Sequence, residues 1–248
     1  MPFCTNCGTR LEVETSFCVG CGRSLGSATR KMAAMAAPAA AAEPLDYTIQ
    51  GDNLQVVRIR LKAGQEVFAE AGKMVYKFPD VRWENRENGN GSLARFYAAS
   101  PSEVGFAGAS PGRIQAFHLK DGQSMLVARE AFLCAQTTAR LDVAPVAKRG
   151  AEELTMKRLT GPGTMFVHGG GDFIEFVLNP GQAIQVEPSA IVAFDDAVSY
   201  GIETELPAGE GPLLATMTGP GRVVIQSMKA GTVRRAAFEH DAVPAMSL

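Results

Sequence analysis

The stretch RIRLKAGQEVFAE, residues 58–70, has the pattern of two short strands joined by a tight turn. Ile59 and Leu61 alternate with charged residues before the turn, and Val67 continues the alternation after it. A period of two places successive side chains on opposite faces of a strand. Gly64, between the two halves, supplies the backbone freedom that a tight turn needs. The stretch therefore predicts a β-hairpin with one buried face.

The same phrase returns twice along the chain. Its Gly-Gln pairs begin at Gly64, Gly122 and Gly181, which are 58 and then 59 residues apart, and apolar residues alternate on both sides of each pair. A second phrase, Thr-Gly-Pro-Gly, begins at Thr160 and recurs 58 residues later at Thr218. Repetition at a fixed spacing is the sequence signature of a structure built from repeats. The pattern predicts three hairpin-rich repeats.

Helical patterns of useful length are absent from this region. Only AKRGAEEL, residues 147–154, is compatible with a helical turn or two. Hairpin-rich repeats without intervening helices are typical of an all-β sandwich or barrel. Each unit alone would expose an apolar face, so we expect triplicated β-sandwich units in a pseudo-threefold arrangement.

The N-terminal part carries four cysteines in two Cys-x-x-Cys-Gly pairs. Two residues between thiolates allow one turn to direct both sulfurs at the same ion, and four thiolates complete the closed shell of a structural zinc site. Disulfides and a redox Cys-x-x-Cys are the alternatives. No apolar leader precedes the cysteines and no βαβ pattern surrounds them, which favours metal. We therefore predict a small zinc ribbon that binds one structural zinc ion through Cys4, Cys7, Cys18 and Cys21.

Composition divides the chain into four parts. The zinc ribbon occupies residues 1–25, where apolar residues are too few to form a core without the metal. Residues 26–46 are rich in alanine and contain two prolines, which is typical of an exposed, semi-rigid linker. Residues 47–228 hold the triplicated β domain. Residues 229–248 show no clean period and are expected to form a flexible tail.

The charge balance limits the classes of function. Lys and Arg number 24 against 26 Asp and Glu, and the formal net charge is −2. Binding of nucleic acid through its phosphates requires clustered basic residues, so this balance argues against nucleic acid. No apolar run reaches the roughly 18 to 20 residues of a membrane-spanning helix. With no apolar leader and no transmembrane segment, we expect a cytoplasmic protein.

Two short motifs resemble parts of a serine hydrolase. Residues 108–112 read Gly-Ala-Ser-Pro-Gly, and residues 168–171 read His-Gly-Gly-Gly. In that mechanism the backbone N–H after the nucleophile helps to form the oxyanion hole, but Pro111, after Ser110, has no N–H. We interpret the first motif as a turn and predict no enzymatic activity.

The remaining polar candidates are isolated. Asp195 and Asp196 could perform acid–base chemistry, but a turn in which Asp caps its own backbone is the favoured interpretation. Cys134 is expected to fill space in the interior. A metal site within the β domain is not expected, because no His-x-His pair occurs among the three histidines, His118, His168 and His240.

Four longer stretches of the β domain resemble one known family. They are VFAEAGKMVY (67–76), LTGPGTMFVHGGG (159–171), VEPSAIVAFDDAVSYGIE (186–203) and LLATMTGPGRVVIQ (213–226). Together they resemble the altered-inheritance-of-mitochondria family over residues 47–228. The resemblance implies a triplicated β-sandwich akin to the tryptophan RNA-binding attenuation protein.

These observations predict a non-enzymatic interaction or scaffold protein. The zinc ribbon would dock an unidentified protein partner on a β-sandwich platform, and the chain could form a homo-oligomer. Two alternatives stay open, which are binding of a small molecule and binding of nucleic acid by the β domain.

Overall fold

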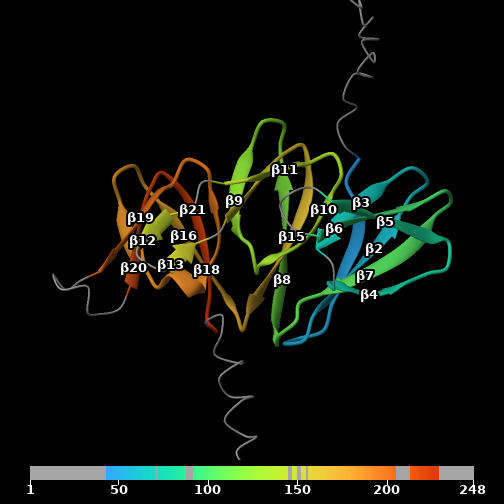
Figure 1. Ribbon diagram of the computed structural model, residues 1–248, viewed down its shortest axis with the longest axis horizontal. Helices are drawn as coiled ribbons and strands as arrows, with labels where there is room; N and C mark the ends of the chain where they lie inside the picture. The colour runs from blue at the N-terminus through green and yellow to red at the C-terminus, as the bar shows by residue number, and fades with distance from the viewer. Residues whose placement is uncertain are drawn as a thin grey trace, which may run out of the picture. The chain divides into compact units, whose positions relative to one another are not determined.

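The computed structural model describes part of one compact unit, Ala42–Leu248, namely residues 43–70, 72–87, 92–144, 147–149, 152–154, 156–204 and 213–228. Apart from the short 3-10 helix η1 (Pro188–Ala190), the regular elements of these residues are strands (Figure 1). The prediction of an all-β fold is confirmed. The expected zinc ribbon (1–25), nearly all of the linker and the tail (229–248) lie outside the described residues.

The strands fall into three groups that follow the sequence repeats. The first group is β1 (Asp46–Gln50), β2 (Val56–Leu61), β3 (Glu66–Glu70), β4 (Met74–Lys77), β5 (Val81–Glu87), β6 (Ser92–Ala98) and β7 (Ser102–Ala107). The second is β8 (Gly112–Leu119), β9 (Ser124–Ala128), β10 (Phe132–Gln136), β11 (Arg140–Val143), β12 (Ala147–Arg149), β13 (Glu152–Leu154), β14 (Met156–Thr160) and β15 (Gly163–Gly170). The third is β16 (Phe173–Leu178), β17 (Ala183–Val186), β18 (Ile191–Asp195), β19 (Ser199–Thr204), β20 (Leu213–Thr218) and β21 (Gly221–Gln226).

The recurring Gly-Gln phrase forms the same turn each time. In the first copy, Gly64 has φ 80° and the Gln65 N–H donates to the Lys62 carbonyl over 3.0 Å, which is the pattern of a type II turn. The Gln65 side-chain oxygen accepts a hydrogen bond from the Lys62 N–H over 3.1 Å. Gln123 and Gln182 make equivalent bonds to the residues at the start of their own turns. The glycine supplies the positive φ and the glutamine side chain closes the turn.

The predicted β-hairpin was wrong, because β2 pairs with β1 and β7 whereas β3 pairs with β6 and β10, so the turn joins strands of two different sheets. The period of two correctly predicted the buried face of β2, but it does not determine which strand lies beside which.

Four sheets contain most of the strands. Sheet I has the order β1-β2-β7-β4, and sheet II the order β5-β6-β3-β10-β15-β8. Sheet III has the order β11-β14-β9-β18-β21-β16, and sheet IV the order β17-β20-β19. Every pairing is antiparallel between these strands. Sheets II and III thus each combine strands of two successive repeats.

The four sheets pack face to face, with an apolar core between each successive pair. The first core lies between sheets I and II and includes Ile59 and Phe106 from one side and Leu133 from the other. The second core lies between sheets II and III, with Phe132 opposite Met125, and the third lies between sheets III and IV. Because side chains alternate along a strand, sheets II and III bury both of their faces. Sheets I and IV each contribute one face to a core.

The repeats are joined by two equivalent seams. In the first seam β3 pairs with β10, where Phe68 lies opposite Ala135. In the second seam β9 pairs with β18, where Leu126 lies opposite Phe194. A third seam, between β17 and β4, would close the three repeats into a ring, and the pairings of the described strands do not include it. The pseudo-threefold arrangement stays a prediction.

One local expectation was wrong. Within residues 147–154, the residues that the structure describes form β12 and β13, which pair with Lys148 opposite Glu153, and not a helical turn. Helix propensity is a weak prior that strand pairing overrides in a short segment.

Candidate interaction surface

The edge strand β4 of sheet I exposes apolar side chains. Met74 is 38% exposed and Val75 60%. The residue eleven places after the turn glycine is Val75 in the first repeat, Leu133 in the second and Val192 in the third. Leu133 and Val192 are fully buried, at 0% exposure. The first repeat therefore presents to solvent a position at which the other two repeats pack against a neighbour.

The three positions also share their backbone geometry. In each repeat the register of the pairing shifts at this point, between Met74 and Tyr76 in β4 and at the matching places in β10 and β18. Such a bulge places one additional residue in the strand and alters where its side chains point. The exposure of Val75 thus reflects the lack of a covering neighbour among the described residues and not a different strand conformation.

Strand β17, at the edge of sheet IV, is the counterpart of β4. Its central residue Gln185 is exposed, whereas the equivalent residues Phe68 and Leu126 are 5% and 3% exposed. Ile184 on the same strand is partly buried against the third core. Figure 1 places β4 and β20, the pairing partner of β17, on opposite sides of β9 and β10.

A charged cluster covers the outer face of sheet I beside β4. The Tyr76 hydroxyl donates to the Glu103 carboxylate over 2.7 Å, and Arg58 donates to the same oxygen over 2.9 Å. The hydrogen bond from Tyr76, together with the Arg58 guanidinium, lowers the pKa of Glu103. Burial and the bond to Glu103 raise the pKa of Tyr76. The ring of Tyr76 lies over Gly105, where an added Cβ would be 2.2 Å from it.

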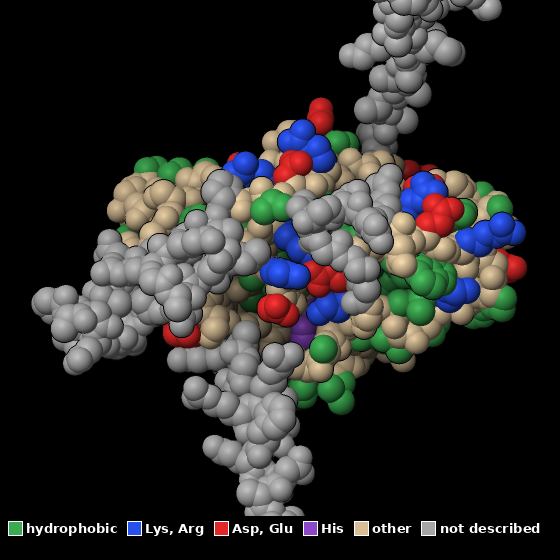
Figure 2. Space-filling model, in the orientation of Figure 1, with side chains coloured by type: hydrophobic (Ala, Val, Ile, Leu, Met, Phe, Trp, Pro, Cys, Tyr) green, Lys and Arg blue, Asp and Glu red, His purple; other side chains and the backbone are tan. Residues whose placement is uncertain are grey.

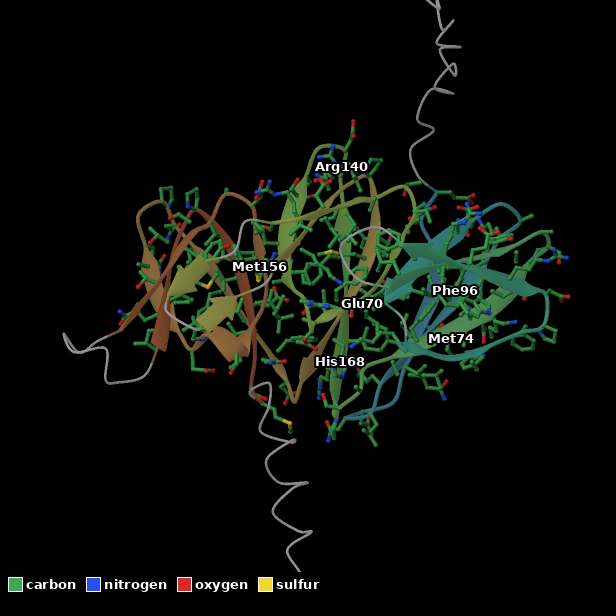
Figure 3. The ribbon with its side chains drawn as sticks, viewed as in Figure 1. Glu70, Met74, Phe96, Arg140, Met156 and His168 are labelled. Carbon is green, nitrogen blue, oxygen red and sulfur yellow. The ribbon has the colours of Figure 1, made fainter. Side chains whose placement is uncertain are left out.

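A second polar group lies at the seam between the first two repeats. Lys157, whose side chain is 6% exposed, forms an ion pair with Glu70 and lies over the ring of Phe132. Burial lowers the pKa of Lys157. Figure 3 shows Glu70 near the middle of the described strands. The pair joins sheet II to sheet III, which indicates a structural contact.

The two hydrolase-like motifs lie side by side. Gly170 pairs with Gly112 along β15 and β8, and an added Cβ on Gly108 would be 2.3 Å from the His168 ring. His168 is 6% exposed, and its side chain forms a hydrogen bond with the backbone of Ser110. The imidazole therefore contacts the peptide group of Ser110. Burial, and then the charge of Lys73, lower the pKa of His168. The segment joins β7 to β8, so the strand–turn–helix context of a nucleophile is not formed.

The acidic pair of the third repeat, Asp195 and Asp196, lies at the turn that follows β18. An oxygen of Asp195 accepts from the Arg222 N–H over 2.8 Å, and the Val198 N–H donates to the Asp195 carbonyl. Asp196 forms an ion pair with Arg158 over 2.9 Å. The two carboxylates therefore bind different partners. Asp195 begins the expected turn, but its carboxylate binds the backbone of β21 and forms no bond to the backbone of its own turn within the described part of the chain.

The other predicted positions are separate from these groups. The His118 ring nitrogens contact Thr164 and Tyr47, over 3.1 Å and 3.4 Å. Cys134 is fully buried, and burial raises the pKa of its thiol well above the usual value. No group of three metal-ligating side chains occurs among the described residues. The predicted zinc ligands Cys4, Cys7, Cys18 and Cys21 and His240 lie outside those residues.

A pocket of about 310 Å³ lies near the turn between β10 and β11. Its walls include both apolar and polar residues, which are Phe68, Leu93, Thr137, Thr138, Ala139, Arg140 and Leu141. This volume is at the lower end of the range for small-molecule sites.

The visible surface mixes charges of both signs. Figure 2 shows Lys and Arg side chains next to Asp and Glu over the described residues of this face. The open edges of β4 and β17 were not identified by the sequence reasoning. Comparing the three repeats position by position pairs Val75 with Leu133 and Val192, and because all three are apolar the comparison does not indicate which of them is exposed.

Fold and surface together define a protein of stacked antiparallel sheets, in which the edge strands β4 and β17 have no partner on one side among the described residues. The family model described as mitochondrial biogenesis AIM24 matches residues 47–228, and the chain belongs to that family. A crystal structure of a Streptococcus pyogenes protein has the same fold, with a TM-score of 0.69 at 21% identity. That match covers 79% of this chain and 99% of the other. No curated protein matches the chain significantly. Among the described residues, no helix is long and apolar enough to cross a membrane.

Proposed function

We propose that this protein is a non-enzymatic scaffold that acts by binding other macromolecules in the cytoplasm. The observation that carries the proposal is the exposure of Met74 and Val75 on an open strand edge. An apolar edge strand is a ready template for pairing with another chain. The family match supports the assignment only at the level of the family description.

The proposal includes the zinc ribbon as a partner-docking module. Four thiolates from Cys4, Cys7, Cys18 and Cys21 fit one structural zinc ion. The linker between ribbon and β domain is rich in alanine, whose burial yields little apolar area, so the ribbon would be free to engage a partner. The attenuation-protein-like, pseudo-threefold arrangement of three repeats is the platform in this proposal.

The test separates docking from stability. We expect the purified chain to contain one zinc ion, measured by plasma mass spectrometry. Replacing Cys18 and Cys21 with Ser should abolish zinc binding and reduce partner capture in an affinity experiment, while the melting temperature of the β domain stays within about 2 °C. A metal-free wild-type chain, or a large loss of stability in the variant, contradicts the docking role.

Small-molecule binding is the second candidate, because the pocket that includes Phe68 and Arg140 offers both apolar and polar walls. Native mass spectrometry of the purified chain tests it. A co-purifying ligand that is lost when Leu93 is replaced with Trp would support this function.

A further inference from the structure

We infer that strand β4 of one copy of this chain pairs with strand β17 of a second copy. The inference rests on the proposed binding function and identifies the partner as another molecule of the same protein. The seam would repeat the two seams already present within each chain, β3 with β10 and β9 with β18.

The internal seams determine the register of the third. Cys134 pairs with Ala69 in the first seam, and Ala193 pairs with Val127 in the second. Counted from the turn glycines, the matching residues of the open edges are Tyr76 and Val186. The next pairs in an antiparallel ladder are then Lys77 with Gln185 and Phe78 with Ile184.

The side chains along this register are complementary. Phe78 forms an apolar pair with Ile184. Tyr76, whose hydroxyl donates to Glu103, lies opposite the apolar Val186. Between these pairs the Lys77 ammonium can donate to the Gln185 amide oxygen. Cross-strand apolar pairs are a main source of stability in sheets. Phe78 is 52% exposed in the single chain, which leaves apolar area to bury.

Val75 gains a neighbour in the same arrangement. Its equivalents, Leu133 and Val192, belong to the cores shared with the preceding repeat. By the same geometry Val75 would face the third core of the neighbouring copy, beside the partly buried Ile184 of that copy. The two ends of the chain therefore supply the two halves of one seam.

A proline limits the hydrogen bonding at one end of the proposed pairing between β4 and β17. In the internal seams the N–H of Thr137 donates to the Glu66 carbonyl, and the N–H of Asp196 donates to the Ser124 carbonyl. Pro79 occupies the matching position and has no N–H to donate. The seam between copies is thus shorter than the internal ones, and we expect association that depends on protein concentration.

Association of this kind is head to tail. One surface of each copy binds a different surface of the next, and such contacts form a ring if the rotation closes. A two-fold dimer would instead place β4 against β4. The two possibilities give different cross-linking patterns.

The first experiment measures the mass of the full-length chain by light scattering over a range of concentrations. We expect oligomers in the wild type and an apparent dissociation constant raised about tenfold or more by Val75→Lys, because the seam would bury an unpaired charge. Val177→Lys is the control, since Val177 is 78% exposed on β16 and lies outside the proposed seam. A wild-type chain that is monomeric throughout overturns the inference, as does equal behaviour of the two variants.

The second experiment tests the register. A tagged Phe78→Cys chain is mixed with an untagged Ile184→Cys chain and oxidised gently, with the wild-type mixture as the background from native cysteines. Directly opposed residues are close enough for a disulfide, so we expect a heterodimer. Gln185→Cys in place of Ile184→Cys directs the thiol to the other face and should cross-link several-fold less. Equal yields, or a Phe78→Cys homodimer as the main product, contradict the register. If the cross-linking contradicts this register, the proposed zinc-dependent capture of a partner is unaffected, because it is tested separately.

Discussion

The ammonium nitrogen of Lys157 lies 4.8 Å from the centre of the Phe132 ring, and the same side chain forms an ion pair with Glu70. Three strands from two sheets meet at this contact. A positive charge over an aromatic face is attracted by the ring, and the carboxylate balances it in a largely dry environment. The arrangement tolerates the buried charge only while both partners are present.

Replacing Glu70 with Gln should therefore destabilise the protein. The change keeps the shape of the side chain but leaves the Lys157 ammonium without its counter-charge, at a cost of about 1–3 kcal/mol. The free energy of unfolding in urea measures the effect. The double variant Glu70→Gln, Lys157→Met should recover most of the loss, because Met packs on Phe132 without a charge. A double variant as unstable as the single one would contradict this account.

The stability contributed by His168 should depend on pH. Its pKa is lowered in the folded chain by burial and by the charge of Lys73, from an ordinary value of 6.5. As the pH falls below 6.5, the unfolded chain takes up a proton that the folded chain resists, so the wild type loses stability. We expect the stability advantage of the wild type over His168→Asn to shrink between pH 7 and pH 5, followed by urea unfolding. An advantage that is constant over this range would exclude the effect.

Replacing Gly108 with Ala should disturb the packing of His168. The added methyl group would be 2.3 Å from the imidazole ring, and overpacking of this kind costs about 1–3 kcal/mol. Gly201→Ala is the matched control, because an added Cβ there meets nothing within 4 Å. Thermal unfolding should show a lowered melting temperature for the first variant only. Similar melting temperatures for both would show that the His168 ring moves aside freely.

The Glu103 carboxylate should contribute stability at neutral pH and lose it in acid. Its pKa is lowered in the folded chain, chiefly by the hydrogen bond from Tyr76, from an ordinary value of 4.5. The contribution is complete above pH 4.5 and disappears as the pH falls through the folded-state value. Glu103→Gln should reduce the free energy of unfolding by about 1 kcal/mol at pH 7. Below the folded-state pKa of Glu103, the wild type and Glu103→Gln should have the same free energy of unfolding. A difference that persists there would show that packing, and not the charge, is responsible.

Part of the fold could be predicted because its signals are local. The turn at Gly64 is determined by a glycine with positive φ and by a glutamine three residues after Lys62, and the same chemistry recurs at Gly122 and Gly181. The pairing of the strands on its two sides is not local, and the predicted hairpin was wrong because β2 and β3 belong to different sheets. The AKRGAEEL segment was also misread. Its helix-forming composition is a weak preference, and the pairing of β12 with β13 outweighs it.

The candidate surface could not be located in the same way. Nothing local distinguishes Val75 from Leu133, since both are apolar residues eleven places after a turn glycine. Their difference in exposure arises from the neighbour, which is β3 for β10 and lies outside the described pairings for β4. The neighbour of a strand depends on contacts between distant parts of the chain, which a window of sequence does not contain.

The sequence alone determined the repeats, the all-β class, the positions of the Gly-Gln turns and the Cys-x-x-Cys spacing that predicts zinc, because these depend on the spacing of residues along the chain. Only the tertiary structure decided that the repeats share sheets through the β3–β10 and β9–β18 seams, and that β4 and β17 are edge strands within the described part of the chain. Hydrogen bonding between strands joins residues that are far apart in sequence. The physical difference between a buried Leu133 and an exposed Val75 is therefore a property of the folded chain and not of either residue.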